Sequence, residues 1–174
     1  MKNILILSFI LVATLGFTQE IKTKEAHITF FSEKESIKAE NSEVESTLDV
    51  SNGTLTFIVA IEKFIFPNGM MQKHFNQEGV MNSVSFPKAN FEGTITNNDQ
   101  IDYTTDGEYP VEVKGKMSIK GVSKEILVKG NIVIKNGQIS AQSVFSLDRF
   151  EYGVDTKKES VSQILEITVK ADYK

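Results

Sequence analysis

Few side chains of this sequence are arranged for catalysis or metal binding. The chain has two histidines, His27 and His74, which lie far apart, and it contains no cysteine. A structural zinc site needs four nitrogen or sulfur ligands, so we expect no metal site. No motif combines a serine, an aspartate and a histidine as in a hydrolase. If the protein were an enzyme, His74 would be its only plausible general base. We expect no catalytic residue and no cofactor.

The acidic residues and the glycines also lack a catalytic pattern. Two close carboxylate pairs, Glu33 with Glu35 and Glu43 with Glu45, fit a solvated surface, because an acid–base pair needs a defined cleft. The eleven glycines are spread singly along the chain, whereas a phosphate-binding loop needs several together. With 19 Lys plus Arg against 23 Asp plus Glu, the chain is mildly acidic, which argues against nucleic acid as a partner.

Apolar bulk is the most distinctive feature of the sequence. It has twelve phenylalanines and five methionines but no tryptophan, and many of these side chains crowd between residues 64 and 91. A helix that plugs one end of a core explains this crowding, and so does the wall of a pocket for a flexible apolar ligand. For such a pocket, we predict that the ligand-binding residues are Phe57, Phe64, Phe66, Met70, His74, Phe75, Met81, Phe91, Met117 and Phe145.

Apolar and polar residues alternate along most of the chain, as in strands with one buried face. Between residues 54 and 66, Leu55, Phe57, Val59 and Ile61 fall on one side, which we expect to face inward. Between residues 111 and 119, Val111, Val113, Met117 and Ile119 likewise form one apolar face. Similar runs predict about eight strands, near residues 27–32, 44–50, 54–66, 89–96, 111–119, 126–134, 139–147 and 165–173. Eight antiparallel strands form either a closed barrel or a sandwich, and closure removes exposed edges.

Two Asn-Gly dipeptides and one helical segment divide these strands. Asn52-Gly53 and Asn136-Gly137 each predict a hairpin with a type I′ turn, because both residue types tolerate positive φ. Residues 68–82 lack alternation and carry apolar side chains at helical spacing, with Asn68 able to cap the start and Pro87 following the end. The sequence therefore predicts an all-β fold with one short helix.

The N-terminus has the layout of a secretory signal peptide. Lys2 precedes an uncharged apolar segment, residues 4–17, and charged residues begin at Glu20. That segment is shorter than the roughly 18–20 residues of a membrane-spanning helix, so we expect no stable membrane insertion after cleavage before Gln19. Residues 1–18 are thus predicted to be the signal peptide and 19–174 to be one domain of an exported protein, periplasmic or secreted. The sequence has no cysteine to carry a lipid anchor.

Four segments resemble, in order along the chain, the YceI-like family of bacterial periplasmic proteins. They are Met70–Asn76, Phe86–Gly93, Val113–Lys124 and Asp148–Val154. The third is similar to the family signature G-x-L-T-I-x-G-V-T-K, with Met117 in place of the leucine and serines in place of the threonines. In the fourth, residues 149–151 interrupt the family's closer spacing. The resemblance implies a lipocalin-like, extended antiparallel β-barrel, here of eight strands, whose interior binds a polyisoprenoid or related lipid without catalytic residues.

Binding energetics favour a long apolar ligand. Burying one methylene group contributes roughly 0.8 kcal/mol, while association costs on the order of 4–15 kcal/mol, so only a long chain is retained. We therefore predict a non-catalytic carrier of a long-chain isoprenoid or other lipid. Two alternatives stay open: a solid barrel whose loop at residues 97–108 contacts another envelope protein, and an isoprenoid-modifying enzyme with His74 as its base. The sequence does not distinguish a monomer from a dimer.

Overall fold

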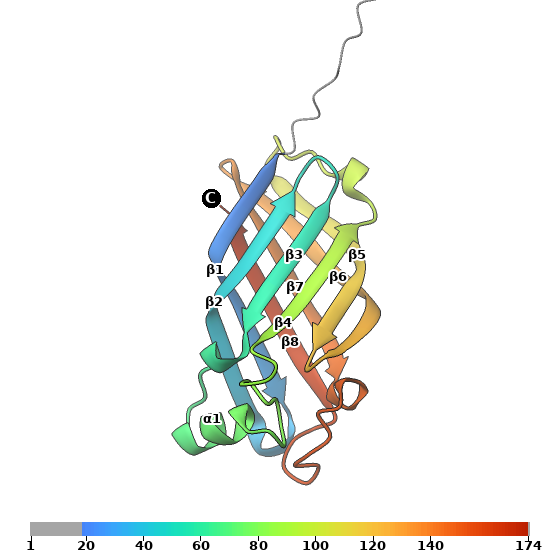
Figure 1. Cartoon of the computed structure of the whole chain (residues 1–174). Coiled ribbons are helices and arrows are strands. Elements are labelled where there is room, and N and C mark those ends of the chain that lie inside the picture. The colour runs from blue at the N-terminus through green and yellow to red at the C-terminus, as the bar shows by residue number, and fades with distance from the viewer. Residues whose placement is uncertain (1–18, 174) are drawn as a thin grey trace, which may run out of the picture.

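The computed structural model describes residues 19–173, and these form one closed, antiparallel β-barrel of eight strands (Figure 1). Neighbouring strands follow the order of the sequence, and β1 closes the barrel by pairing with β8. The strands are β1 (Glu20–Ser32), β2 (Ile37–Asp49), β3 (Thr54–Ala60), β4 (Lys88–Ile95), β5 (Gly107–Ile119), β6 (Val122–Lys135), β7 (Gln138–Asp148) and β8 (Ile164–Tyr173). The predicted eight-stranded barrel is confirmed, whereas the predicted signal peptide lies outside the described residues.

Strand alternation sends one set of side chains into the barrel and the other set toward solvent. In β3, Leu55, Phe57 and Val59 are buried, and the residues between them are partly exposed. In β5, Val111 and Val113 are buried between exposed neighbours. The predicted inward face of both strands is confirmed. The strand predicted over residues 54–66 is too long, because β3 ends at residue 60 and a 3-10 turn follows.

The Asn136-Gly137 turn between β6 and β7 has the predicted geometry. Asn136 has a φ of 52° and Gly137 has a φ of 74°, so both residues adopt the left-handed conformation of a type I′ turn. The flanking Lys135 and Gln138 form the last pair of the ladder. A two-residue turn therefore joins β6 to β7.

The loop at Asn52-Gly53 differs from its prediction. It joins β2 to β3 as a hairpin, but β2 ends at Asp49 and only Gly53 has a positive φ, at 75°. The Asp49 carboxylate accepts hydrogen bonds from the Ser51 backbone N–H (3.0 Å), the Ser51 hydroxyl (2.6 Å) and the Asn52 side-chain amide (2.8 Å). These bonds stabilise a longer loop, so the prediction of a two-residue type I′ turn was wrong here.

One α-helix and four 3-10 turns accompany the strands of the described chain. These elements are α1 (Gly69–Asn76), η1 (Lys34–Ser36), η2 (Ile61–Lys63), η3 (Asn98–Gln100) and η4 (Arg149–Tyr152). Asn68 caps α1 as predicted, because its side chain accepts from the Met70 N–H at 2.8 Å. The helix is shorter than the predicted 68–82, since Gln77 is extended and ends it. No helix within residues 19–173 is long and apolar enough to span a membrane.

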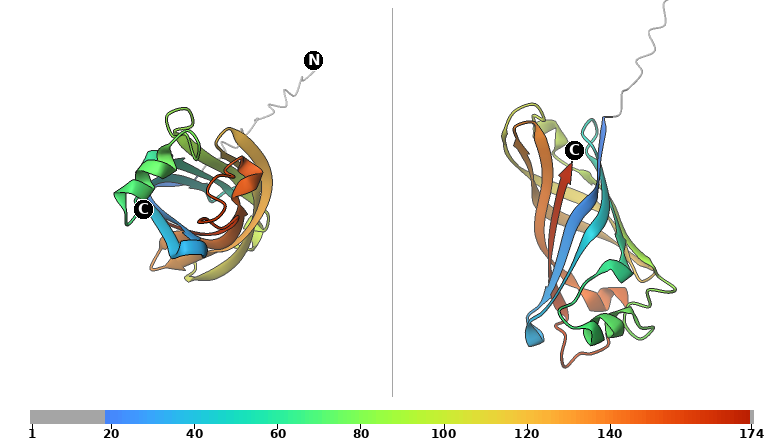
Figure 2. Two further views of the ribbon diagram at one scale, coloured as in Figure 1. Left: turned by 90° about the horizontal axis from the view of Figure 1, so that it is seen from below. Right: turned by 90° about the vertical axis from the view of Figure 1, so that its left-hand side faces the viewer.

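The two ends of the barrel are built differently (Figures 1 and 2). The upper end is the one with the β2–β3 and β4–β5 loops and with Tyr173, the last residue of β8. The lower end is the one with α1 and η4. At the upper end, the Tyr173 hydroxyl lies 2.8 Å from Ser46 Oγ. Tyr103 donates to Asn98 Oδ1 (2.8 Å), and the Asn98 amide donates to the Val50 carbonyl (3.1 Å). Hydrogen-bonded side chains therefore tie the upper loops together.

Candidate ligand-binding site

The barrel interior contains a cavity with a volume of about 250 Å³. Its wall is almost wholly apolar and is built by inward-facing side chains from seven strands together with the segments at the lower end. The strand residues that form most of the wall are Ile28, Phe30, Leu55, Phe57, Val59, Phe91, Ile95, Val111, Val113, Met117, Ile132, Phe145, Leu147, Leu165 and Ile167. The cavity does not reach Leu48 or Tyr173, which are buried at the upper end.

A pair of glycines shapes one side of this wall. Gly93 of β4 and Gly115 of β5 face each other in the ladder. A Cβ atom at either position would come within 2.8 Å of Phe91 Cζ. The glycines therefore leave room for the Phe91 ring to lie against the wall. A side chain at either position would displace this ring or strain the strand pair, which would change the shape of the cavity.

Four phenylalanines form an aromatic cluster at the lower end. Phe30 comes from β1, Phe64 and Phe66 follow β3, and Phe75 comes from α1, with ring centroids 5.0–5.8 Å apart. Such aromatic contacts are favourable beyond their apolar burial. Phe75 therefore anchors α1 beside the lower mouth, as we call the end of the cavity nearest α1 and η4, and Figure 2 shows the helix at one side of this end of the barrel.

Arg149 organises the other side of the lower mouth. This arginine is buried, and its guanidinium group donates hydrogen bonds to the carbonyls of Val154, Thr156 (2.8 Å), Val161 (3.0 Å) and Ser162 (2.8 Å). Burial lowers its pKa, but an arginine stays charged at neutral pH. The four carbonyls compensate for the desolvation of this charge, so Arg149 holds the segment after η4 in place.

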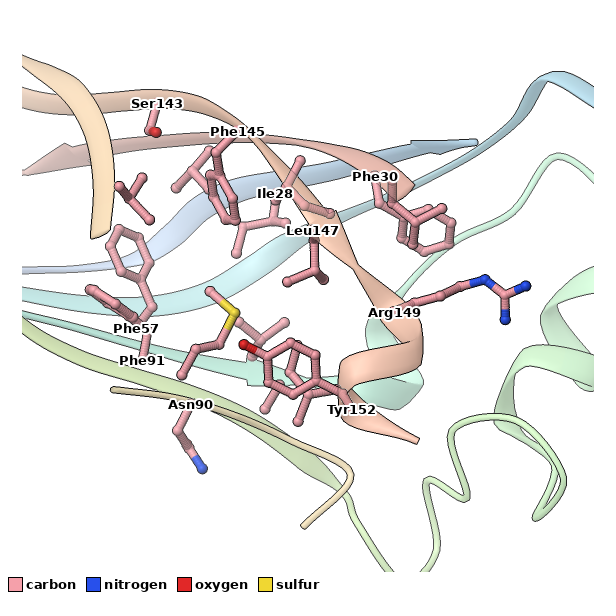
Figure 3. Close-up of a pocket in the computed structure, with 18 of the residues that line it drawn as sticks. Ile28, Phe30, Phe57, Asn90, Phe91, Ser143, Phe145, Leu147, Arg149 and Tyr152 are labelled. Atoms are coloured by element: carbon pink, nitrogen blue, oxygen red, sulfur yellow. The ribbon is translucent and has the colours of Figure 1, made fainter. Parts of the chain in front are cut away.

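Two polar atoms in the wall lack a partner. Among the described residues, neither the Tyr152 hydroxyl nor Thr156 Oγ1 has a hydrogen bond, and both residues line the cavity. Figure 3 shows the Tyr152 ring extending from η4 into the barrel, toward the side of Phe57 and Phe91. The Arg149 side chain extends in the opposite direction, away from these rings (Figure 3). Burial raises the pKa of Tyr152, with a smaller contribution from Glu151, so its hydroxyl stays protonated at neutral pH.

The cavity also reaches the wall where β6 and β7 diverge. Their ladder runs from the Lys135–Gln138 pair to the Asn131–Gln142 pair and ends there. Next to this end, the Ser143 hydroxyl donates to the Lys129 carbonyl at 2.6 Å. Gly130 and Ser143 line the cavity at this point. A side-chain hydrogen bond therefore takes the place of a backbone pair where the two strands separate.

Seven of the ten predicted ligand-binding residues line the cavity. They are Phe57, Phe64, Phe75, Met81, Phe91, Met117 and Phe145. Phe66 is buried in the aromatic cluster behind the wall. Met70 is 69% exposed on α1. His74 is exposed too, and its Nδ1 lies 2.9 Å from Gln77 Oε1. Contact with a ligand stays a prediction for the residues of the cavity wall.

Sequence reasoning missed several residues of the wall. Ile28 and Phe30 belong to a predicted strand, but only the closed barrel shows that they face the cavity. Arg149 and Tyr152 lie in a segment that resembles the family, yet their charge and hydroxyl gave no signal of an inward position. Within residues 19–173, no three histidine, aspartate or glutamate side chains are grouped as a metal site would require.

Comparisons with known proteins agree with this architecture. The family model of the YceI-like domain matches residues 19–173. No curated protein sequence gives a significant match.

Solved structures from three bacteria share the fold. BcnA of Burkholderia cenocepacia is 15% identical with a TM-score of 0.70, over 84% of this chain and 96% of that one. A polyisoprenoid binding domain from Saccharophagus degradans, implicated in plant cell wall breakdown, is 10% identical with a TM-score of 0.76. The match covers 89% of this chain and 97% of that one. The YCEI protein of Campylobacter jejuni is 16% identical with a TM-score of 0.60, and the match covers 80% of this chain and 86% of that one. Because the family match spans the described barrel, the chain belongs to the family of YceI-like domains.

Proposed function

We propose that this protein binds a long apolar ligand, a polyisoprenoid or a related lipid, inside the barrel and carries it without changing it chemically. The observation that carries the proposal is the apolar cavity of about 250 Å³ in the barrel interior. The Saccharophagus degradans domain, which is described as polyisoprenoid-binding, has the same fold and supports this choice of ligand.

The size and chemistry of the cavity favour a slender chain. Ligand pockets for small molecules commonly measure roughly 300–1,000 Å³, so a cavity of about 250 Å³ suits a narrow chain better than a bulky ring system. Each methylene group that enters the apolar wall contributes roughly 0.8 kcal/mol. Met81 and Met117 add flexible side chains, which adapt to chains of different shape.

The two alternative functions have less support. A solid barrel that acts only through its surface needs no cavity, so the cavity favours a carrier over such an interaction module. An isoprenoid-modifying enzyme needs a catalytic group near the bound chain. His74, the candidate base, is exposed on α1 and does not line the cavity.

Export to the periplasm or out of the cell is part of the proposal. Its support is the sequence of residues 1–18, with Lys2 before an uncharged apolar segment. N-terminal sequencing of periplasmic material is expected to show a mature protein that begins near Gln19. Recovery of the chain with Met1 in the membrane fraction contradicts a soluble exported carrier.

Native mass spectrometry tests the carrier function. The full chain is expressed with its own N-terminal segment, purified from the periplasm and sprayed under non-denaturing conditions. We expect a second species heavier than the protein by the mass of one lipid, which disappears after extraction with organic solvent. Added geranylgeraniol should then bind to the extracted protein. If no lipid co-purifies and no added prenyl chain binds, the proposal is wrong.

A further inference from the structure

The unpaired hydroxyl of Tyr152 is unusual for a residue in its position. Tyr152 is only 1% exposed, and its hydroxyl has no hydrogen-bond partner among the described residues. Buried polar groups nearly always have a partner, because an unpaired one destabilises the folded state. A phenylalanine would fill the same space without this cost. The position of the hydroxyl in the cavity wall therefore points to a partner outside the chain.

Two other polar groups of the wall are already bonded. Arg149 donates to four backbone carbonyls, and its side chain points away from the barrel interior (Figure 3). The hydroxyl of Ser143 donates to the Lys129 carbonyl. The hydroxyls of Tyr152 and Thr156 differ from Arg149 and Ser143, because they have no partner in the described chain and can bond to a ligand.

The local structure holds both hydroxyls in place. Asp148 accepts from the Phe150 N–H (2.9 Å) and caps the start of η4, and Gly153 ends η4 in the left-handed conformation with a φ of 68°. Arg149 bonds to the carbonyl of Thr156 and so fixes the backbone that carries the second hydroxyl. Both groups are therefore preorganised, which lowers the entropic cost of binding.

We infer that the cavity takes a lipid with one neutral oxygen at its head, such as an alcohol or a ketone, and that the hydroxyl of Tyr152 binds this oxygen, with Thr156 as a second polar group of the same wall. The inference rests on the proposed function and specifies the polar group of its ligand. A hydroxyl both donates and accepts, so the two side chains suit either a hydroxyl or a carbonyl oxygen. An ionised head group is disfavoured, because a charge loses its hydration in an apolar cavity.

The same assignment fixes the orientation of the ligand. Tyr152 lies at the lower end on η4, whereas the apolar wall continues to Ile95 and Ile132. The head group therefore lies near the lower mouth, and the hydrocarbon tail extends toward the closed upper end.

Matched ligands and matched variants test the inference. The probes are geranylgeraniol and the hydrocarbon of the same length that lacks the hydroxyl group, each measured by displacement of an uncharged fluorescent fatty alcohol from extracted protein. The variants are Tyr152→Phe and Thr156→Val. Tyr173→Phe is the control, because it removes the hydroxyl of another buried tyrosine that lies outside the cavity. Circular dichroism checks the fold of each variant.

We expect Tyr152→Phe to lower the affinity for the alcohol relative to the hydrocarbon by about 3- to 10-fold, as for the loss of one hydrogen bond. Thr156→Val should lower the same ratio by a smaller factor, and Tyr173→Phe should leave it unchanged. If the ratio of alcohol to hydrocarbon affinity is unchanged in Tyr152→Phe, the inference is contradicted, because the hydroxyl then bonds to water or stays unpaired. Tighter binding of geranylgeranyl diphosphate than of the alcohol contradicts the neutral head group. If the wild-type protein binds neither probe, the proposed function fails instead.

Discussion

Two buried tyrosines mark the difference between the ends of the barrel. At the upper end, Tyr173 is 4% exposed, and its hydroxyl bonds to Ser46, which in turn donates to the Thr56 carbonyl at 2.9 Å. At the lower end, Tyr152 is buried as deeply but has no partner among the described residues. The same residue type thus has a bonded hydroxyl at one end of the barrel and an unpaired hydroxyl in the cavity wall at the other end.

Packing around the two tyrosines follows the same division. Leu48, which is fully buried, belongs to the upper part of the core that the cavity does not reach. Met117 belongs to the lower part, where the wall encloses the cavity. A protein interior is normally close-packed, and voids larger than a water molecule are few. The part of the barrel that the cavity occupies, from the lower end up to Leu55 and Ile95, therefore departs from the usual packing of a core, whereas the region around Leu48 and Tyr173 keeps it.

The largest effect is expected from removing apolar volume at the upper end. Leu48→Ala should lower the free energy of unfolding by about 2–5 kcal/mol, because it creates a new cavity in a packed region. Met117→Ala should cost clearly less, since its side chain already borders a void. Urea titration of both variants measures the difference. Equal losses of unfolding free energy in the two variants would mean that the regions around Leu48 and Met117 are packed alike.

The tight turns at the two ends offer a second comparison. Gly137 of the upper β6–β7 turn has open space around its Cα, whereas a Cβ at Gly121 of the lower β5–β6 turn would lie 2.8 Å from Phe86 Cε1. Both glycines have positive φ, at 74° and 80°. Gly137→Ala should cost about 1–2 kcal/mol through backbone strain alone, and Gly121→Ala should cost more. Thermal unfolding compares them, and a smaller loss in Gly121→Ala would show that Phe86 moves freely.

Removing one hydroxyl from each tyrosine should have opposite consequences. Tyr173→Phe loses the bond to Ser46 and should lower the free energy of unfolding by about 0.5–1.5 kcal/mol. Tyr152→Phe removes an unpaired buried group and should leave the stability of the ligand-free protein unchanged or slightly higher. The measurement is urea unfolding after lipid extraction. A large loss in Tyr152→Phe would reveal a structural bond of this hydroxyl.

The smallest effect concerns acid stability at the upper end. Hydrogen bonds from the hydroxyls of Thr104 and Thr105 lower the pKa of Asp102 from its ordinary value of 3.8. The stabilisation from these hydrogen bonds is therefore complete above the ordinary pKa of 3.8. It is lost as the pH falls through the lower pKa that Asp102 has in the folded protein. The melting temperature of Asp102→Ala should lie below that of the wild-type protein at pH 7, and the gap should narrow toward pH 2. A constant gap would assign the effect to lost packing.

Local patterns in the sequence predicted most of the barrel. Alternation placed Phe57 and Val113 inward, and Asn136-Gly137 defined a turn, because each signal depends only on neighbouring residues. The loop at Asn52-Gly53 was predicted incorrectly because the Asp49 side chain competes for the local backbone and side-chain donors. The end of α1 was predicted too late, since the apolar spacing continues beyond residue 76 while the backbone leaves the helix.

The cavity wall was harder to predict than the fold. Phe91 and Phe145 are apolar residues on alternating strands, so their inward position follows from the pattern. Tyr152 faces the interior because Arg149 holds the short turn by bonding to backbone carbonyls that lie up to thirteen residues away in sequence. Only the folded chain brings those carbonyls together. A polar residue in a short turn therefore carried no sequence signal of its role.

The most direct test of a ligand inside the barrel compares two neighbouring residues of β7. Phe145 lines the cavity, whereas Val144 is 61% exposed on the outer face. Extracted protein is titrated with geranylgeraniol for the wild type, Phe145→Asp and Val144→Asp, with circular dichroism as a check on folding. We predict normal binding by Val144→Asp and a loss of at least about tenfold in affinity by folded Phe145→Asp, because a carboxylate in the wall retains water that the prenyl chain must displace. Met117→Asp repeats the test from β5. Wild-type affinity in both folded cavity variants would contradict a binding site inside the barrel.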